Sequence, residues 1–353
     1  MSLGKGVMSL DEDSLLIPAS YSRIIARELN LQERELEPLL RGTGLPINIL
    51  LPGDEAYITA QQQMRVLDNA QHILGSPEIG LRLGRQLQPS SHGPLGYLVL
   101  SSPDVITALE SFADFLPLRL PLASVQVDLD EHYLTCILEI RVSAKPNVLR
   151  IMQECFALMI QAVVESVLGR ELTEASIELQ HARPSHSDCY GDYLHSAVHF
   201  SQTVNRVQMP AVLARKANAS GHSDSYSLSQ DHCCRLLEQI PVSAMSTTDQ
   251  VRRLLLSHPA GSITEADVAR EMFVSKRTLA RRLAEEGSSY RTISEKLLSE
   301  LAVRHLRESN FSIDAVAASL GYCDAAAFRK AFRRWYGQTP SQYRRDKLLM
   351  PIS

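Results

Sequence analysis

The sequence has 353 residues, of which 44% are hydrophobic and 22% are charged. This composition excludes a disordered or fibrous chain, and the length favours two domains over one. The net charge of -4 at pH 7, taken over the whole chain, argues against nucleic acid as a partner. Uninterrupted apolar runs, such as residues 96–100 and 254–256, fall far short of the roughly 18 residues that a membrane span needs.

The cysteines and the first residues predict a reducing compartment. Six cysteines are scattered along the chain without a CxxC pair: Cys136, Cys155, Cys189, Cys233, Cys234 and Cys323. Residues 1–10 contain no apolar segment of the kind found in secretory signals. Together these features predict a cytoplasmic protein without disulfides, and residues 1–18 are predicted to form a mobile tail.

Residues 19–215 carry mixed periodicities that predict an α+β domain. Helical spacing of apolar residues covers residues 21–29, 60–74, 103–115 and 148–168. Alternation of apolar and polar residues predicts a hairpin of residues 124–129 and 132–140 around the acidic pair Asp130–Glu131. Short strands are expected at residues 176–180, 197–200 and 206–209. Helices first and then strands interrupted by a helix are typical of α+β folds.

A linker is predicted over residues 216–244. Residues 216–230 are rich in Ser, Asn, Asp and Gly and show almost no apolar periodicity, which favours a loop. A short helix is expected at residues 231–239.

Residues 245–347 predict an all-α domain that contains the same unit twice, followed by a tail at 348–353. In the first copy Ser262 or Thr264 can cap one helix, Ser275 can cap a second over residues 276–285, and Gly287 ends it. In the second copy Ser312 caps a helix, Gly321 supplies a turn with positive φ, and Asp324 opens the next helix. A long helix over residues 290–307 joins the copies. Each copy is therefore a predicted helix-turn-helix.

The charge is divided unevenly between the two regions. Residues 245–353 contain 18 Lys and Arg against 12 Asp and Glu, a net +6, while the rest contains 18 against 28, a net -10. The second helices of the two copies present most of the predicted binding residues, Lys276, Arg277, Arg281, Arg282, Arg329, Lys330, Arg333 and Arg334. A single basic helix is usually a solvated face, but two matched ones in the only net-basic region favour binding of double-stranded DNA.

The C-terminal region resembles the AraC/XylS transcription regulators. The run from Gly321 to Arg344, GYCDAAAFRKAFRRWYGQTPSQYR, looks like the C-terminal signature of that family. Upstream, DVAREMFVSKRTLARRL at residues 267–283 looks like the first helix-turn-helix of the same domain. The resemblance covers about 100 residues and implies a regulator, expected to be an activator, that binds promoter DNA and contacts RNA polymerase. The resemblance places base-reading positions at Arg277, Ala280 and Arg281, and at Ala326, Ala327 and Lys330, and it adds Arg344 as a phosphate contact.

Two positions depart from the family pattern. Phe273 stands where a small turn residue is common, and Leu298 stands where the joining helix usually has Arg. Because alanine cannot hydrogen-bond a base, the second copy is expected to read few bases directly and to depend on phosphates and DNA shape.

The N-terminal region resembles the arabinose-binding-type effector domain of one branch of the same family, which includes ornithine-utilisation regulators. This similarity rests on residues 90–109, IELQH at 177–181 and VHF at 198–200. It implies a domain that senses a small molecule and forms a homodimer, without naming the effector.

Three alternatives remain open from the residues. His181, His186, Cys189, His195 and His199 could hold a metal, although their spacing matches no zinc template, and no metal or other cofactor is assigned. Cys233–Cys234 could sense redox state, although adjacent cysteines on a helix are more often inert. The N-terminal domain could also serve oligomerisation alone.

Met152, Phe156 and Met159 lie on one helix face and are interpreted as core, although soft side chains suit an apolar ligand. Motifs of common enzymes are missing from the sequence, so an enzyme is not expected.

Overall fold

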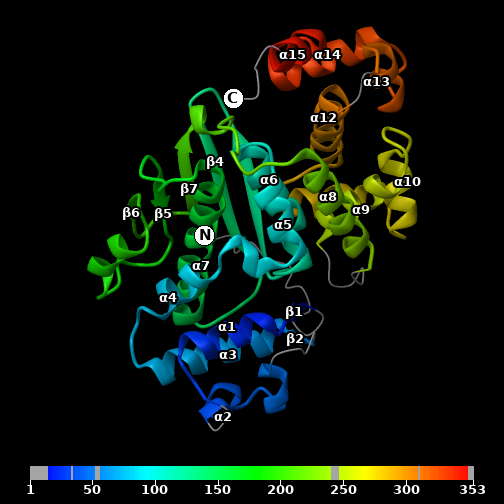
Figure 1. The fold of residues 1–353 in the computed structure, drawn as a ribbon. Coiled ribbons are helices and arrows are strands. Elements are labelled where there is room, and N and C mark those ends of the chain that lie inside the picture. Colours follow the sequence, from blue (N-terminus) through cyan, green and yellow to red (C-terminus); the bar gives the residue numbers. More distant parts are fainter. Residues whose placement is uncertain (1–14, 33–34, 52–55, 240–245, 309–310, 349–353) are drawn as a thin grey trace, which may run out of the picture. The chain divides into compact units, whose positions relative to one another are not determined.

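The computed structural model describes residues 15–32, 35–51, 56–239, 246–308 and 311–348 (Figure 1). They belong to two compact units, an N-terminal unit within residues 8–244 and a C-terminal unit within residues 245–353. Each unit has its own core. The N-terminal unit combines sheets with helices and the C-terminal unit is entirely helical in its described part, as predicted.

A five-stranded sheet organises the second half of the N-terminal unit. Its strand order is β3-β4-β7-β5-β6, and all neighbours are antiparallel except β5 and β6. The strands are β3 (Ala123–Leu129), β4 (Tyr133–Ile140), β5 (Ser176–Glu178), β6 (Ala197–His199) and β7 (Asn205–Pro210). The predicted hairpin is confirmed as β3 and β4. Asp130 closes its turn by accepting hydrogen bonds from the backbone of His132 and Tyr133, and these bonds lower the pKa of its carboxyl.

A second, two-stranded sheet pairs β1 (Leu16–Pro18) with β2 (Tyr57–Thr59). The predicted tail over residues 1–18 is therefore wrong at its end, because Leu15 and Ile17 are fully buried and residues 16–18 form a strand. The rest of that tail, residues 1–14, lies outside the described residues, as does the predicted C-terminal tail from residue 349 on.

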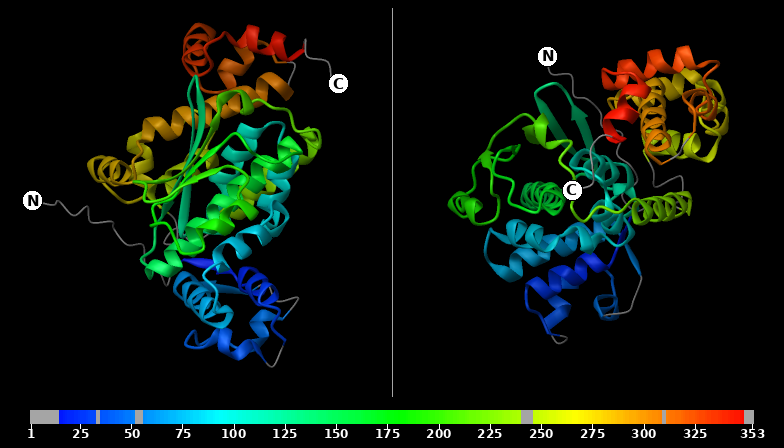
Figure 2. Two further views of the ribbon diagram at one scale, coloured as in Figure 1. Left: turned by 90° about the vertical axis from the view of Figure 1, so that its left-hand side faces the viewer. Right: turned by 45° about the horizontal axis from the view of Figure 1, so that its top comes forward.

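Helices cover the remainder of the N-terminal unit (Figures 1 and 2). They are α1 (Ser20–Glu28), α2 (Leu36–Leu40), α3 (Ala60–Leu74), α4 (Ile79–Gln86), α5 (Pro94–Ser101), α6 (Val105–Phe115), α7 (Pro146–Leu168) and α8 (Ser223–Gln239). The predicted helices at residues 21–29, 60–74, 103–115 and 148–168 are thereby confirmed. Thr59 and Gln62 form a capping box at the start of α3, which explains why that helix begins where the sequence predicts.

The helix α7 is the central element of the N-terminal unit. It packs against α3, α4, α5, α6 and strand β7. Gly80 and Gly84 allow α4 to approach closely, since a Cβ on Gly84 would lie 2.5 Å from a methyl carbon of Leu158. By length and composition α7 could cross a membrane, which the short apolar runs did not suggest, but 83% of its most apolar stretch is buried inside the unit. That burial is what a core helix requires.

The helix α8 corrects the predicted loop. Residues 223–230 belong to a 17-residue helix that packs against α5, so the loop predicted over residues 216–230 is wrong in its second half. The cause is an apolar stripe too thin to stand out among Ser and Asp. Cys233 and Leu237 are buried, and the Tyr226 hydroxyl lies 3.0 Å from the Ser111 hydroxyl.

The C-terminal unit consists of helices around two cores. The helices are α9 (Thr247–Ser257), α10 (Glu265–Glu271), α11 (Lys276–Glu285), α12 (Tyr290–Glu308), α13 (Ile313–Ser319), α14 (Ala325–Tyr336) and α15 (Pro340–Leu348). The first core joins α9, α10, α11 and the start of α12, and the second joins the end of α12 with α13, α14 and α15. The two copies and the long joining helix are therefore confirmed.

Candidate nucleic-acid interface

The second helix of the first copy, α11, has one buried and one exposed face. Ser275 caps it by accepting a hydrogen bond from the Thr278 backbone, while Leu279 and Leu283 are fully buried in the first core. Four of the predicted residues are exposed on its other side, Lys276, Arg277, Ala280 and Arg281. Arg282 differs because it is half-buried and its Nε has no hydrogen-bond partner among the described residues.

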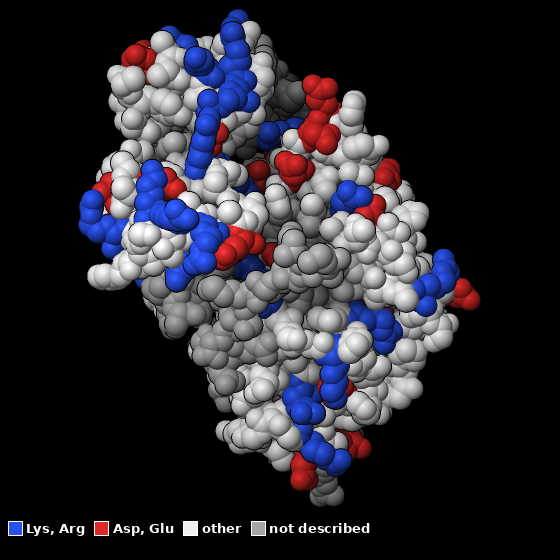
Figure 3. Space-filling model, turned by 180° about the vertical axis from the view of Figure 1, so that it is seen from behind, with Lys and Arg blue, Asp and Glu red and all other residues white. Residues whose placement is uncertain are grey.

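The second helix of the second copy, α14, repeats this arrangement. Asp324 accepts a 2.7 Å hydrogen bond from the Ala327 backbone, and Phe328 and Phe332 are fully buried. The exposed residues are Ala326, Arg329, Lys330, Arg333 and Arg334, and Ala327 is half-buried. On a face of the C-terminal unit, Figure 3 shows lysine and arginine side chains gathered at the upper left.

Carboxylates hold three of the exposed cations. Lys276 Nζ lies 2.9 Å from Glu265, Arg334 Nη2 lies 2.9 Å from Glu295, and Arg281 Nε lies 4.0 Å from Glu285. Glu295 also binds Arg291 of its own helix, so it joins α12 to α14. Among the exposed cations of α11 and α14, the remaining four have no carboxylate partner among the described residues: Arg277, Arg329, Lys330 and Arg333. The sequence pattern did not predict the roles of Glu265 and Glu295.

Arg344 lies apart from the two exposed helix faces, on α15. Its side chain is half-buried, and Nη1 donates a 2.7 Å hydrogen bond to the Phe311 carbonyl just before α13. Its Nε and Nη2 have no hydrogen-bond partner among the described residues. In the structure, therefore, Arg344 fastens α15 to the start of the second helix-turn-helix.

The two copies touch each other through two glycines. Gly261 and Gly321 both have positive φ, at 73° and 77°. A Cβ on Gly261 would lie 2.8 Å from the Leu320 carbonyl oxygen, and one on Gly321 would lie 2.7 Å from the Ala260 carbonyl oxygen. Only glycine fits such an approach of two backbones. The predicted turn at Gly321 is confirmed, whereas its contact with Gly261 was not predicted.

Phe273 occupies the turn of the first copy, in the place that Gly321 takes in the second. Its φ is 55°, and its side chain is 95% exposed. The backbone nitrogens of Phe273 and Gly321 both bond the carbonyl three residues earlier, those of Arg270 and Ala318. Aligning the two copies would have revealed this positive φ in advance. Leu298, the other departure from the family pattern, is half-buried and packs against the second core.

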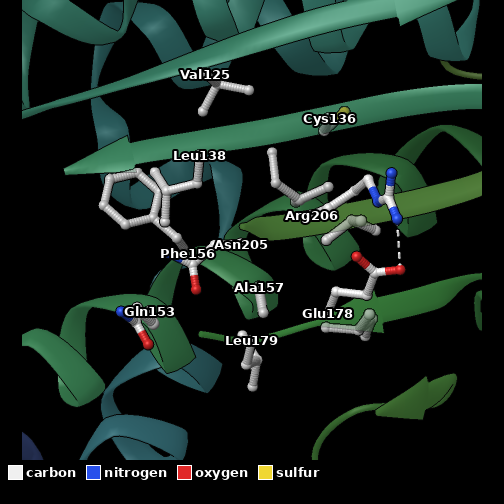
Figure 4. Close-up of a pocket in the computed structure, with 13 residues that line it drawn as sticks. Val125, Cys136, Leu138, Gln153, Phe156, Ala157, Glu178, Leu179, Asn205 and Arg206 are labelled. Atoms are coloured by element: carbon white, nitrogen blue, oxygen red, sulfur yellow. Dashed lines mark hydrogen bonds and ion pairs between the residues drawn. The ribbon is translucent and has the colours of Figure 1, made fainter. Parts of the chain in front are cut away.

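The N-terminal unit contains a pocket between the sheet and α7, which Figure 4 shows. Val125, Cys136 and Leu138 line it from β3 and β4, and Phe156 and Ala157 line it from α7. Arg206 and Glu178 form a 2.6 Å ion pair at its edge. Met152, Phe156 and Met159 are buried, as the core interpretation requires, and they also line a second cavity on the other side of α7.

The histidines and cysteines that could have held a metal have separate partners. His195 Nδ1 lies 2.6 Å from Glu165, His186 lies 3.5 Å from Glu154, and Cys189 lies 3.6 Å from Glu78. No group of three or more potential metal ligands is found among the described residues. Burial raises the pKa of the Cys233 thiol to about 12, so this thiol is protonated at neutral pH and a poor nucleophile.

Comparisons with known proteins agree with both units. Residues 34–218 match the arabinose-binding N-terminal domain of AraC transcription regulators, and residues 268–346 match a helix-turn-helix domain. The chain is 28% identical over 279 residues to the ornithine utilization regulator of Pseudomonas aeruginosa, covering 78% of this chain and 81% of that protein. It is 24% identical over 313 residues to the regulator VirS of Mycobacterium tuberculosis, covering 87% and 90%.

Among solved structures, the regulator CdpR from Pseudomonas aeruginosa aligns with 91% of this chain and 98% of its own, at 24% identity and a TM-score of 0.44. The family assignment depends on the domain matches, since the first of them spans more than half of the chain. The chain belongs to the AraC family of transcription regulators, with an arabinose-binding-type N-terminal domain and a helix-turn-helix DNA-binding domain.

Proposed function

We propose that α11 and α14 are the recognition helices, which enter two successive major-groove segments on one face of the duplex, about 34 Å apart. The observation that carries this proposal is the pair of equivalent helices, each with a buried apolar face and an exposed basic face. The Gly261–Gly321 contact supports a fixed spacing between them, because it packs one helix-turn-helix directly against the other.

The cations divide into two groups by their surroundings. Arg277, Arg329, Lys330 and Arg333 have no carboxylate partner among the described residues, so a phosphate can bind them without displacing a protein group. Lys276, Arg281 and Arg334 must share or exchange a carboxylate when they bind DNA. Arg282 and Arg344 are half-buried, and Arg344 is already bonded to the Phe311 carbonyl, so Arg344 acts mainly by positioning α15.

Base reading is assigned mainly to the first copy. Arg277 and Arg281 are exposed on α11, and a guanidinium can bond guanine O6 and N7 at once. The corresponding α14 positions hold Ala326, Ala327 and Lys330, of which only Lys330 can donate a hydrogen bond. The second copy then contributes affinity through phosphates and sensitivity to DNA shape.

In the cell we propose that this cytoplasmic protein acts as a homodimeric activator that contacts RNA polymerase. A small molecule bound to the N-terminal unit would change promoter occupancy, and no enzymatic activity is expected. The family's domain pair supports effector control, and the net -10 outside residues 245–353 assigns DNA to the C-terminal unit.

The test is a gel shift of the full chain on its own upstream DNA at several salt concentrations. We expect steep weakening with salt, because each neutralised phosphate releases counterions. Arg333→Ala should weaken binding to all sequences alike and reduce the salt slope by about 1, whereas Arg281→Ala should relax base preference. Arg170→Ala, the same charge change in the N-terminal unit, is the control. Salt-independent or absent binding would overturn the proposal.

A further inference from the structure

The second cavity of the N-terminal unit lies among helices rather than within the sheet. Its lining comes from α1, α3, α4, α7 and residues 120–122, and its volume is about 610 Å³ including the open space at its mouth. Three half-buried leucine and isoleucine side chains line the cavity: Ile24 of α1, Leu67 of α3 and Leu87 at the end of α4. From α7 it is lined by residues such as Met152 and Met159.

None of the lining side chains is charged at neutral pH. The lining combines aliphatic and aromatic residues and methionines with only three polar groups, those of Tyr21, Gln63 and Cys155. Burial raises the pKa of Tyr21 to about 12 and also raises that of Cys155, so both groups are neutral. An ionised ligand would therefore lose its hydration without gaining an opposite charge from the lining. The Arg119 guanidinium lies outside the lining, 5.5 Å from the centroid of the Tyr21 ring, and already donates a 3.1 Å hydrogen bond to the Ser20 hydroxyl.

Two of the three polar groups are already bonded. The Tyr21 hydroxyl lies 2.8 Å from Nδ1 of the buried His92, whose other hydrogen bond goes to the Leu87 backbone. The Cys155 thiol points to the Gly80 carbonyl at 3.4 Å. These contacts leave little hydrogen-bonding capacity for a polyol.

Gln63 supplies the one donor that has no partner. Its side chain is 5% exposed, and its Oε1 accepts a 2.8 Å hydrogen bond from the Ser22 hydroxyl. Its Nε2 makes no hydrogen bond with any described residue. Nε2 is not among the fully buried atoms without a partner, so it is accessible, and a ligand that brings a single acceptor to Gln63 gains one hydrogen bond in place of a water.

We infer that this cavity is the effector site and that it takes a neutral, apolar molecule of on the order of ten non-hydrogen atoms with one hydrogen-bond acceptor, such as a ketone or an ester. The inference deepens the proposed effector control and rests on it. A sugar would bury several hydroxyls without partners, and a zwitterionic amino acid would bury two charges without counterions. The cavity therefore differs in chemistry from what the arabinose-binding description of the domain suggests.

The probe is 2-nonanone, added to the full-length protein and followed by isothermal titration and by the melting temperature of the N-terminal unit. We expect saturable binding and a concentration-dependent rise in melting temperature, because a ligand that binds only the folded state stabilises it. Nonanoate should bind at least about 10-fold more weakly, since its charge finds no partner in the lining. L-Arabinose and L-ornithine should not bind at millimolar concentration. Binding of either of these two with no binding of 2-nonanone would overturn the inference.

Two variants locate the site. Leu67→Trp places a larger ring at the cavity and should reduce 2-nonanone affinity about 10-fold or more, whereas Leu228→Trp, the same change at a 68% exposed position of α8, should not. Gln63→Leu removes the donor, so the preference for 2-nonanone over propylbenzene should fall about 3- to 10-fold, the value of one hydrogen bond. Because both affinities are measured in the same variant, a loss of protein stability would affect both ligands alike and would not change their ratio.

Unchanged affinity in Leu67→Trp and an unchanged ratio in Gln63→Leu would place the ligand elsewhere. DNA binding of the ligand-free protein is measured separately, so that the two proposals can fail independently. Loss of DNA binding would overturn the proposed function and leave this cavity assignment standing.

Discussion

The contact between the two helix-turn-helix copies can be tested with one methyl group. Gly321→Ala adds a Cβ that would lie 2.7 Å from the Ala260 carbonyl oxygen and 3.1 Å from the Gly261 Cα. Both neighbours are backbone atoms, which cannot move aside as a flexible side chain can. Gly337→Ala is the matched control, because Gly337 has a similar φ of 70° and no atom within 4 Å of the added Cβ.

The expected losses follow from two separate effects. A left-handed conformation costs an L-residue about 1–2 kcal/mol, and alanine offsets about 0.5–1 kcal/mol of this by restricting the unfolded chain. Gly337→Ala should therefore lower the free energy of unfolding by about 1 kcal/mol or less. Gly321→Ala adds overpacking of about 1–3 kcal/mol, for a total of about 2–4 kcal/mol.

The assay is urea unfolding of the full chain, followed by tryptophan fluorescence. Trp335 is the only tryptophan, and it packs near Tyr322 and Phe332 in the second core, so its emission reports on the C-terminal unit alone. With a slope of about 2 kcal/mol/M, the midpoint should fall by about 1–2 M for Gly321→Ala and by about 0.5 M or less for Gly337→Ala. Equal shifts in the two variants would refute the packing of the copies at this contact.

Three further predictions follow from the same structure. Phe273→Gly should stabilise the C-terminal unit by about 0.5–1 kcal/mol in the same urea assay, because it relieves a positive φ and removes a side chain that is 95% exposed, whereas Phe273→Ala should change little. Glu295→Gln should tighten DNA binding up to about 5-fold at low salt in a gel shift, since it releases Arg334 and removes a negative charge, and no change would count against Arg334 as a DNA contact. Burial lowers the pKa of His92 to about 4, so in this range the unfolded state binds a proton that the folded state does not. The N-terminal unit should therefore lose stability as the pH falls from about 6.5 to 4, measured as the melting temperature by circular dichroism. An equally steep fall of melting temperature with pH in His92→Gln would contradict this.

The C-terminal unit was the most predictable part, because its signals are local. Caps such as Ser275 and Asp324 act within three residues, and the apolar spacing of each helix is strong. What the sequence could not supply were contacts between distant residues. The approach of Gly261 to Gly321 and the Glu295–Arg334 pair, 39 positions apart, exist only once the long helix has brought the copies together.

The structure of the N-terminal unit was harder to predict from the sequence, because parts of it depend on packing between distant elements. The second half of α8 was predicted, but residues 223–230 were missed because their exposed Ser and Asp residues outweigh a thin apolar stripe, and packing against α5 decides their structure. Met152, Phe156 and Met159 looked like core from their spacing, and they are buried. Whether such a face also borders a cavity depends on α1, α3 and α4, which lie more than 60 residues earlier in the chain.

The most direct test of the central claim compares DNA binding by the full chain with binding by residues 245–353. The account predicts that the C-terminal fragment binds the cognate duplex with a steep salt dependence, and that the net -10 of the remaining chain weakens binding of random DNA by the intact protein. Fluorescence anisotropy from 50 to 200 mM salt measures both. Failure of a folded fragment to bind, or tighter binding of random DNA per chain by the full-length protein with dimerisation accounted for, would contradict the account.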